Sequence, residues 1–262
     1  MPDELIDFWG RCGLATQPLA HPDDLSILRQ KRGKFIDADQ VSFDTLMANR
    51  QFRGFDDRFH LSLLPTPYLG DLRHAEIVIM QLNPGLEYTD YWAESKMPHF
   101  RNRLEHNLRQ SFGGVEFPFL FLDPQFCWHT GFLWWEEKLR QVTSAIAESK
   151  FNGSYFDALR DLSTKLACVE LIAYHSSSFR AHILINQLPS AKQALRFVRH
   201  SLVPDAETGK RTLIITRQVR TWGLPSGIEG LVMYDGGQSR GASLSPNSSG
   251  GKAILRRYGI FL

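Results

Sequence analysis

The stretch Glu76-Ile77-Val78-Ile79-Met80-Gln81-Leu82-Asn83-Pro84-Gly85 decides how the rest of the sequence is interpreted. Residues 77–82 are mostly apolar, as expected of a strand that is buried on both faces of a sheet. The run ends at a proline, which cannot donate to a ladder, and a glycine, which permits a sharp turn. Asn83 is therefore expected at the carboxyl end of a core strand, where open α/β sheets place their sites. An ordinary strand and turn would give the same pattern, so this stretch alone does not define a site.

Length and composition favour one large α/β domain, or one domain with a sizeable accessory segment. The chain has 262 residues, of which 43% are hydrophobic, enough to bury a substantial core. Its formal net charge is only +2, so a surface that binds nucleic acid would have to be local.

The three cysteines, Cys12, Cys127 and Cys168, are widely spaced and odd in number. This pattern favours neither a disulfide framework nor a zinc knuckle, and it fits a reducing cytosol. The start of the sequence is acidic and no long apolar run follows it, so we expect neither a signal peptide nor a membrane span. A cytoplasmic protein without membrane contact is the expectation.

Three further apolar runs are typical of core strands, and helical patterns separate them. The strands are expected at residues 166–175, 211–216 and 231–234, and the helices at 136–148, 190–202 and 252–258. This alternation predicts an α/β fold with a doubly wound, mostly parallel central sheet flanked by helices. Residues 1–60 are expected to form a mainly helical N-terminal extension packed on the core, and residues 61–262 the α/β domain.

Several segments near the first strand offer candidate contacts. Residues 86–92 are acidic and aromatic, and we expect a loop that packs over the strand end. Residues 99–109 carry Arg101, Arg103 and Arg109 on an expected helix, whose basic face would either grip phosphates or be solvated. Residues 52–59 mix arginines with aromatic rings, so they would either contact nucleic acid or pin the N-terminal region to the core.

Aromatic residues are dense between residues 117 and 135, where Trp128, Trp134 and Trp135 lie. Such density is typical of a core, and it also suits a platform on which a base or a sugar ring stacks. The sequence contains no P-loop, no dinucleotide-binding glycine pattern and no paired-histidine metal motif. We therefore expect neither a cofactor nor a metal.

Polar residues follow the later strands. Glu170 lies within an apolar run, and a buried carboxylate needs a partner or a ligand because burying it alone is costly. His175 ends the same run and precedes three serines, but no Gly-x-Ser-x-Gly elbow supports a hydrolase triad. Arg217 and Arg220 follow the third strand, and residues 235–251 form a loop rich in glycine and serine.

Three ordered motifs then point to one family. They are Leu82-Asn83-Pro84-Gly85 after the first strand, Val169-Glu170 on the next long strand, and Ser243-Leu244-Ser245-Pro246-Asn247 before the last helix. In this order the chain, from about Tyr68 to its end, resembles the uracil-DNA glycosylase superfamily, in the branch with an Asn-Pro-Gly motif. The sequence departs from that pattern twice, because Ser243 stands where a His or Asn is usual and Glu170 where an Asn is usual.

The resemblance implies a monofunctional DNA glycosylase that flips a pyrimidine out of DNA and leaves an abasic site. It assigns catalysis to Asn83, Ser243 and Asn247, with Asn83 positioning the water or stabilising the sugar. It also implies two sets of binding residues. The base would be bound by Gln81, Leu82, Gly85, Tyr88, Glu170 and His175. The DNA would be bound by Ser245, Ser248, Ser249, Gly250, Arg217 and Arg220.

Glu170 suggests a sharper hypothesis about the base. An ionised carboxylate only accepts hydrogen bonds, and cytosine offers an N4 amino donor where uracil offers a carbonyl. Because unmodified cytosine is everywhere, such an enzyme would need a further mark, such as a hydroxymethyl group or its glucosylated form. The tryptophans would then stack on that substituent, and defence against modified phage DNA would follow. If Glu170 instead pairs with a core arginine, this hypothesis has no support.

Other functions remain open at this stage. One is uracil or mismatch excision in base repair, and another is a catalytically silent nucleic-acid-binding module on the same fold. A third is a hydrolase or nucleoside-processing enzyme that does not act on nucleic acid. We expect a monomer whose partner is single- or double-stranded DNA with a modified or damaged base.

Overall fold

The computed structural model describes residues 2–37, 43–49, 54–55 and 57–261. The chain forms two compact units that interleave along the sequence. The first unit comprises Met1–Tyr68, Leu82–Ser111 and Glu170–Phe197, and the second comprises Leu69–Gln81, Phe112–Val169 and Val198–Leu262. Residues 1–60 belong to the first unit, and neither unit has a boundary at residue 60.

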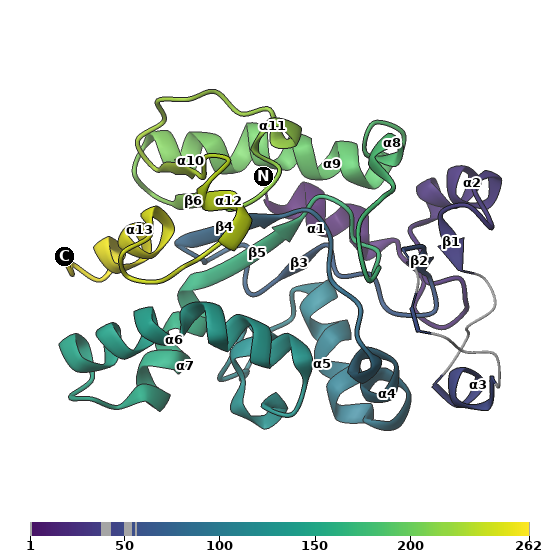
Figure 1. The fold of residues 1–262 in the computed structure, drawn as a ribbon, viewed down its shortest axis with the longest axis horizontal. Coiled ribbons are helices and arrows are strands. Elements are labelled where there is room, and N and C mark those ends of the chain that lie inside the picture. The colour runs from purple at the N-terminus through teal and green to yellow at the C-terminus, as the bar shows by residue number, and fades with distance from the viewer. Residues whose placement is uncertain (1, 38–42, 50–53, 56, 262) are drawn as a thin grey trace. The chain divides into compact units, whose positions relative to one another are not determined.

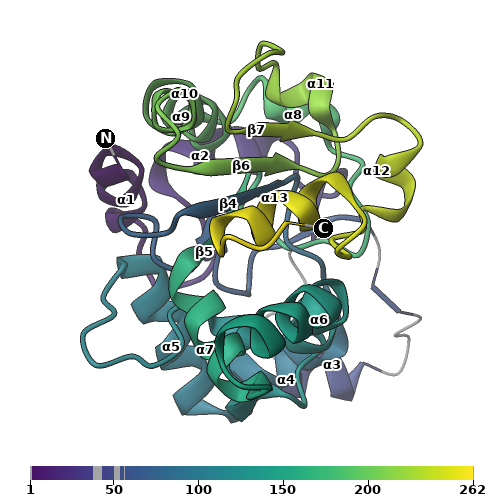
Figure 2. The ribbon, with the colours of Figure 1, turned by 90° about the vertical axis from the view of Figure 1, so that its left-hand side faces the viewer.

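A five-stranded, mostly parallel sheet confirms the predicted α/β class. Its spatial order is β3-β5-β4-β6-β7, and β4 pairs in parallel with β6, as β6 does with β7 (Figure 2). The strand bounds are β3 Tyr68–Leu69, β4 Ile77–Gln81, β5 Leu166–Glu170, β6 Thr212–Ile215 and β7 Leu231–Met233. The apolar side chains of β4 and β6 are buried on both faces, which explains their near-continuous hydrophobic sequence.

Helices of the second unit lie on both sides of the sheet. Helix α10 (Val203–Glu207) lies on one side, and α6 (Thr130–Lys150) and α7 (Tyr155–Lys165) lie on the other (Figure 1). Helix α13 (Ser249–Arg257) packs against α6, β6 and β7 (Figure 2). The short elements of this unit are η1 Leu120–Leu122, η2 Pro124–Phe126, η3 Val198–Leu202, α11 Val219–Trp222 and α12 Gln238–Gly241.

The first unit is mainly helical. Helix α1 (Pro2–Gly10) packs against both α5 (Pro98–Arg109) and α9 (Pro189–Phe197), and α4 (Tyr88–Lys96) packs against α5 (Figure 1). The other elements are α2 Pro22–Gln30, β1 Ile36–Asp37, α3 Phe43–Ala48, β2 Phe59–His60 and α8 His182–Ile185. Strands β1 and β2 form a small parallel sheet of their own, which the helical pattern of residues 1–60 did not predict.

Two sequence expectations about element bounds are wrong. Residues 88–96 form helix α4 rather than a loop, because Glu87 and Asp90 make a reciprocal capping box at its start. Strand β5 ends at Glu170 and not at residue 175, because the next residues bond to loop backbone outside the sheet strands.

Along the described part of the chain, no helix combines the length and the apolar character needed to cross a membrane.

Candidate functional site

The side chain of Asn83 is held in one orientation by three hydrogen bonds. Its Nδ2 donates to Pro84 O at 2.8 Å, to Ser176 Oγ at 2.9 Å and to Tyr174 O at 3.4 Å. Two of these acceptors are backbone carbonyls, which cannot donate, so the amide nitrogen and not its oxygen must face them. The position of Asn83, two residues after the end of β4, matches the sequence prediction.

This orientation turns the amide oxygen away from the three groups that hold the nitrogen. Within the described part of the chain, no hydrogen bond reaches Asn83 Oδ1, and the residue is only half-buried. A fixed amide oxygen with a free lone pair is an acceptor, suited to orient a water molecule or a hydroxyl group.

His175 holds the other end of the Asn-Pro-Gly turn. Its Nδ1 lies 2.8 Å from Gly85 O, and its Nε2 lies 3.2 Å from both Thr66 Oγ1 and Leu64 O. An Nδ1–H donor to Gly85 leaves Nε2 to accept the Thr66 hydroxyl proton. The prediction that His175 contacts the base does not fit this arrangement, because neither ring nitrogen is left for a ligand.

Backbone hydrogen bonds connect the end of β5 and the segment after it to neighbouring parts of the chain. Glu170 N donates to Pro67 O and Ile172 N donates to Leu82 O, each at 2.9 Å. His175 O accepts from His60 N at 3.0 Å. The whole segment from Glu170 to Ser176 is buried, so it forms a rigid support under the Asn-Pro-Gly turn.

Glu170 has the buried position that its sequence context predicted. Its side chain is 6% exposed at the last residue of β5. The other predicted base-binding residues vary in exposure. Gln81 and Leu82 are half-buried, whereas Gly85 is exposed and Tyr88 is 50% exposed at the start of α4. The ring of Tyr88 lies 4.8 Å from that of Phe55, so part of its surface is used in packing.

Residues 235–251, the glycine- and serine-rich loop of the second unit, are called the late serine loop. Tyr234 organises this loop, although the sequence did not mark Tyr234 as a site residue. The Tyr234 hydroxyl donates to Ser243 O, lies 3.3 Å from Ser248 Oγ and accepts from Gly250 N at 3.2 Å. Ser248 then caps α13 by accepting from Gly251 N at 3.0 Å, and it donates to Ser245 O at 2.7 Å. A tyrosine directly after a strand and before a glycine-rich loop was the available signal.

Gly250 and Gly251 are required by the close packing of this loop. A Cβ on Gly251 would lie 1.9 Å from Ser245 O, and one on Gly250 would lie 2.5 Å from the Tyr234 hydroxyl. The glycines therefore let the loop backbone lie directly against the first turn of α13.

The predicted DNA-binding and catalytic residues of the second unit are only partly available. Ser243 Oγ accepts from Ser245 N at 3.1 Å and donates to Ser245 Oγ at 3.1 Å, so both hydroxyls serve the turn. Asn247 is exposed, and no hydrogen bond to its side chain is found among the described residues. Arg217, just before α11, and Arg220, within it, are exposed, whereas Ser249 Oγ is buried at the start of α13.

Two of the three α5 arginines named above, Arg101 and Arg109, have structural roles that argue against phosphate binding. Arg109 donates to the carbonyls of Gly10 and Cys12 and thereby closes the end of α1. Arg101 bonds Glu94, Glu105 and the carbonyl of Leu14. The sequence could not show the bonds to the carbonyls of Leu14 and Cys12, because these residues lie 87 and 97 positions away from Arg101 and Arg109.

The aromatic segment is mostly core, with one exception. Trp135 is buried and makes an edge contact with Phe119 at 4.9 Å, and Trp128 is half-buried. Trp134 is 38% exposed, with Lys138 Nζ 5.7 Å from its ring centre. Of the three tryptophans predicted as a stacking surface, Trp134 therefore offers the most accessible ring. In the segment 52–59, the residues Phe52, Arg53 and Asp56 lie outside the described part of the chain.

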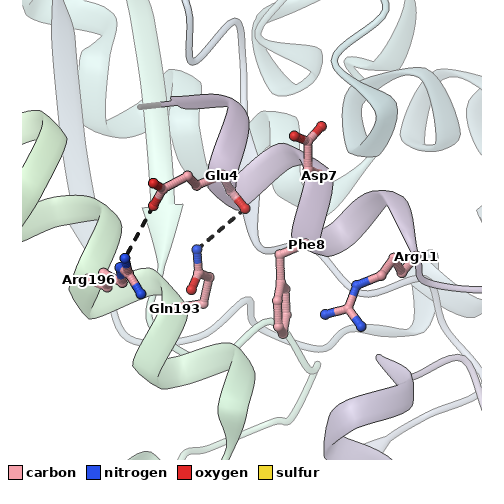
Figure 3. Close-up of a pocket in the computed structure, with 6 residues that line it drawn as sticks. All are labelled: Glu4, Asp7, Phe8, Arg11, Gln193 and Arg196. Atoms are coloured by element: carbon pink, nitrogen blue, oxygen red, sulfur yellow. Dashed lines mark hydrogen bonds and ion pairs between the residues drawn. The ribbon is translucent and has the colours of Figure 1, made fainter.

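A separate hollow of about 390 Å³ lies between α1 and α9 (Figure 3). Its lining residues are Glu4, Asp7, Phe8, Arg11, Gln193 and Arg196. Most of its charges are already paired, because Glu4 lies 3.8 Å from Arg196 and Arg11 bonds Asp23 at 2.7 Å. None of the predicted site residues lines this hollow.

The predicted catalytic and base-binding residues lie in two different units. Asn83, Glu170 and His175 belong to the first unit, and the residues from Ser243 to Gly250 belong to the second. The described residues contain no cluster of three or more His, Cys, Asp or Glu side chains suited to a metal ion. No protein-family model, curated protein or solved structure matches the chain.

Proposed function

We propose that the protein is a monofunctional DNA glycosylase that hydrolyses the N-glycosidic bond of a flipped-out pyrimidine and leaves an abasic site. The observation that carries this proposal is the fixed amide of Asn83 just after a core strand of a mostly parallel sheet. Its Oδ1 is turned away from the protein groups that hold Nδ2, so it can accept a hydrogen bond from a reacting water.

In the proposed reaction the water oxygen forms a bond to C1′ of the sugar while the bond from C1′ to the base nitrogen breaks. The base leaves with the electron pair of that bond, and positive charge develops on the sugar in the transition state. The proton that the water loses ends on the departing base, so the products are the sugar hydroxyl and the neutral free base. Asn83 is too weak a base to take the proton of the water, so its part is to orient the water and to stabilise the sugar. The rate must then come mainly from orientation and from stabilising the leaving base.

The late serine loop supports a role in binding the DNA backbone. Asn247 and Ser243 are exposed on it, and Arg217 and Arg220 offer exposed cations in the same unit. Because the net charge of the chain is only +2, these local groups would have to supply the attraction for phosphate. DNA, bound by a monomer, is the proposed partner.

Glu170 supports a cytosine-type base as the substrate. A buried carboxylate at the end of β5 accepts hydrogen bonds and would favour an amino group over a carbonyl. We therefore propose hydroxymethylcytosine, free or glucosylated, as the excised base. Such a substrate would suit a role in defence against phages with modified DNA.

The test is alkali-revealed strand cleavage on DNAs that contain uracil, hydroxymethylcytosine, glucosylated hydroxymethylcytosine or only ordinary bases. Asn83→Ala should abolish cleavage, and Asn102→Ala, which changes an exposed asparagine of α5, should not. Cleavage of the uracil-containing DNA alone would support the glycosylase activity but contradict the proposal that Glu170 selects a cytosine-type base. Binding of DNA without any cleavage would instead favour a silent binding module, for which the engagement of the Ser243 hydroxyl in its own turn is an argument.

A further inference from the structure

A buried carboxylate from the N-terminal region lies at the centre of a hydrogen-bond network in the first unit. Asp24, on α2, is fully buried. Its Oδ2 accepts from the Tyr174 hydroxyl at 2.5 Å, and its Oδ1 accepts from Ser190 N at 3.0 Å. One carboxylate thus ties together α2, the segment after β5 and the start of α9.

Tyr174 connects this network to the turn that carries Asn83. Its ring is buried beside Trp9 and Phe59, and its hydroxyl also accepts from His21 N at 3.3 Å. At the other end of the residue, Tyr174 O accepts from Asn83 Nδ2 at 3.4 Å. Ser176, two residues further on, accepts from the same nitrogen at 2.9 Å.

The neighbours of Asp24 leave it no other evident function. The ring nitrogens of His21 bond other groups, with Nε2 at 2.8 Å from Phe8 O and Nδ1 accepting from Asp23 N at 3.2 Å. Burial raises the pKa of Asp24, while its bonds to Ser190 and Tyr174 lower it. Burying the Asp24 carboxylate costs desolvation free energy. The hydrogen bonds by which it holds its neighbours in position have to offset that cost.

We propose that Asp24 is a positioning residue for Asn83, acting through Tyr174 and the backbone of residues 174–176. Holding Tyr174 by its hydroxyl fixes the carbonyl of Tyr174 and the side chain of Ser176, and these two groups fix the amide of Asn83. The consequence for catalysis rests on the proposed glycosylase function, whereas the coupling itself does not. The N-terminal region would then be part of the active enzyme and not a separable extension.

The test is to remove the Tyr174 hydroxyl alone and to observe the Asn83 amide. Tyr174→Phe keeps the ring and its packing, and Asp24→Asn keeps the shape of the carboxylate while weakening its bonds. The side-chain NH₂ signals of Asn83 in a ¹⁵N-labelled protein are identified by their loss in Asn83→Ala. Tyr155→Phe is the matched control, because it deletes a similar bond, from the Tyr155 hydroxyl to Glu136 at 2.8 Å, in the second unit.

In Tyr174→Phe and Asp24→Asn, we expect the Asn83 NH₂ signals to shift and their hydrogen exchange to become faster, with the far-UV circular dichroism unchanged. With an active substrate, kcat should fall about tenfold while KM changes little, because orientation and not binding is lost. Folded variants whose Asn83 signals are unchanged, or that match Tyr155→Phe, would overturn the positioning role. An absence of cleavage by the unchanged protein would overturn the proposed function instead, and the amide signals would still test the coupling.

Discussion

The hydroxyl of Ser176 accepts a hydrogen bond from Asn83 Nδ2 at 2.9 Å, although the two residues are 93 positions apart in the sequence. Ser176 is buried, so this bond is shielded from competing water. The pair fixes which atom of the Asn83 amide faces the protein, and therefore which atom is left for a ligand.

Ser176→Ala should lower cleavage about tenfold while leaving the fold intact, because one of the three bonds that hold the amide is lost. The measurement is single-turnover cleavage of the substrate that proves active. Ser177→Ala is the control, since Ser177 is exposed and next in sequence. Equal rates for the two variants would show that Ser176 does not orient Asn83.

Gly251→Ala should destabilise the protein by roughly 2–4 kcal/mol, because the added Cβ would meet the backbone carbonyl of Ser245. The measurement is the free energy of unfolding in urea. Gly241→Ala is the matched control, because no atom lies within 4 Å of the Cβ that it would add. A stable Gly251→Ala protein would show that the loop does not pack on α13 as described.

Stability should fall as the pH rises towards 8, because burial raises the pKa of Glu94 from 4.5 to about 8. Its bonds to Leu64 N and its contact with Arg101 lower the pKa, and Asp90 and Glu105 raise it further, but burial is the largest effect. Between pH 4.5 and about 8, Glu94 therefore stays protonated in the folded state and is ionised in the unfolded chain. The free energy of unfolding should decrease by at most ~1.4 kcal/mol per pH unit across that window.

Glu94→Gln cannot ionise and should remove most of this slope. The measurement is urea unfolding at a series of pH values between the two pKa values, with Glu105→Gln as the control because Glu105 bonds the same arginine. Parallel curves for Glu94→Gln and the unchanged protein would contradict the assignment.

The arginines should separate into two groups in DNA-binding experiments. Arg217→Ala and Arg220→Ala should weaken binding and each reduce the slope of log K against log salt by about 1, if each contacts one phosphate. Arg109→Ala should leave the salt slope unchanged and lower the melting temperature, because Arg109 closes the end of α1. A reduced salt slope in Arg109→Ala would show instead that Arg109 contacts a phosphate and that α5 belongs to the DNA-binding surface.

The sequence predicted best the elements whose bounds follow from the hydrophobic pattern of their own residues. The apolar run before Asn83 and the runs at 211–216 and 231–234 are strands within one or two residues of the expected bounds. For β4 and β6 the reason is burial on both faces, which leaves a continuous hydrophobic pattern, whereas β7 is only half-buried. Strand β3, with only Tyr68 and Leu69, was missed because a two-residue strand has no period.

The contacts that arrange the candidate site could not be predicted from sequence, because they join distant segments. Asn83 was identifiable from the Pro-Gly that follows it, but its bonds to Tyr174 and Ser176 were not. The resemblance predicts that His175 contacts the base, whereas its ring bonds Thr66 and Gly85, which lie elsewhere in the chain.

The most direct measurement of the central claim is alkali-revealed cleavage of DNA containing glucosylated hydroxymethylcytosine, compared between the unchanged protein and Asn83→Ala. We expect abasic sites only with the unchanged protein, since the fixed amide oxygen of Asn83 is required to orient the water. Equal cleavage by both proteins, or no abasic sites on any modified or uracil-containing DNA, would contradict the claim that this turn is the catalytic centre of a glycosylase.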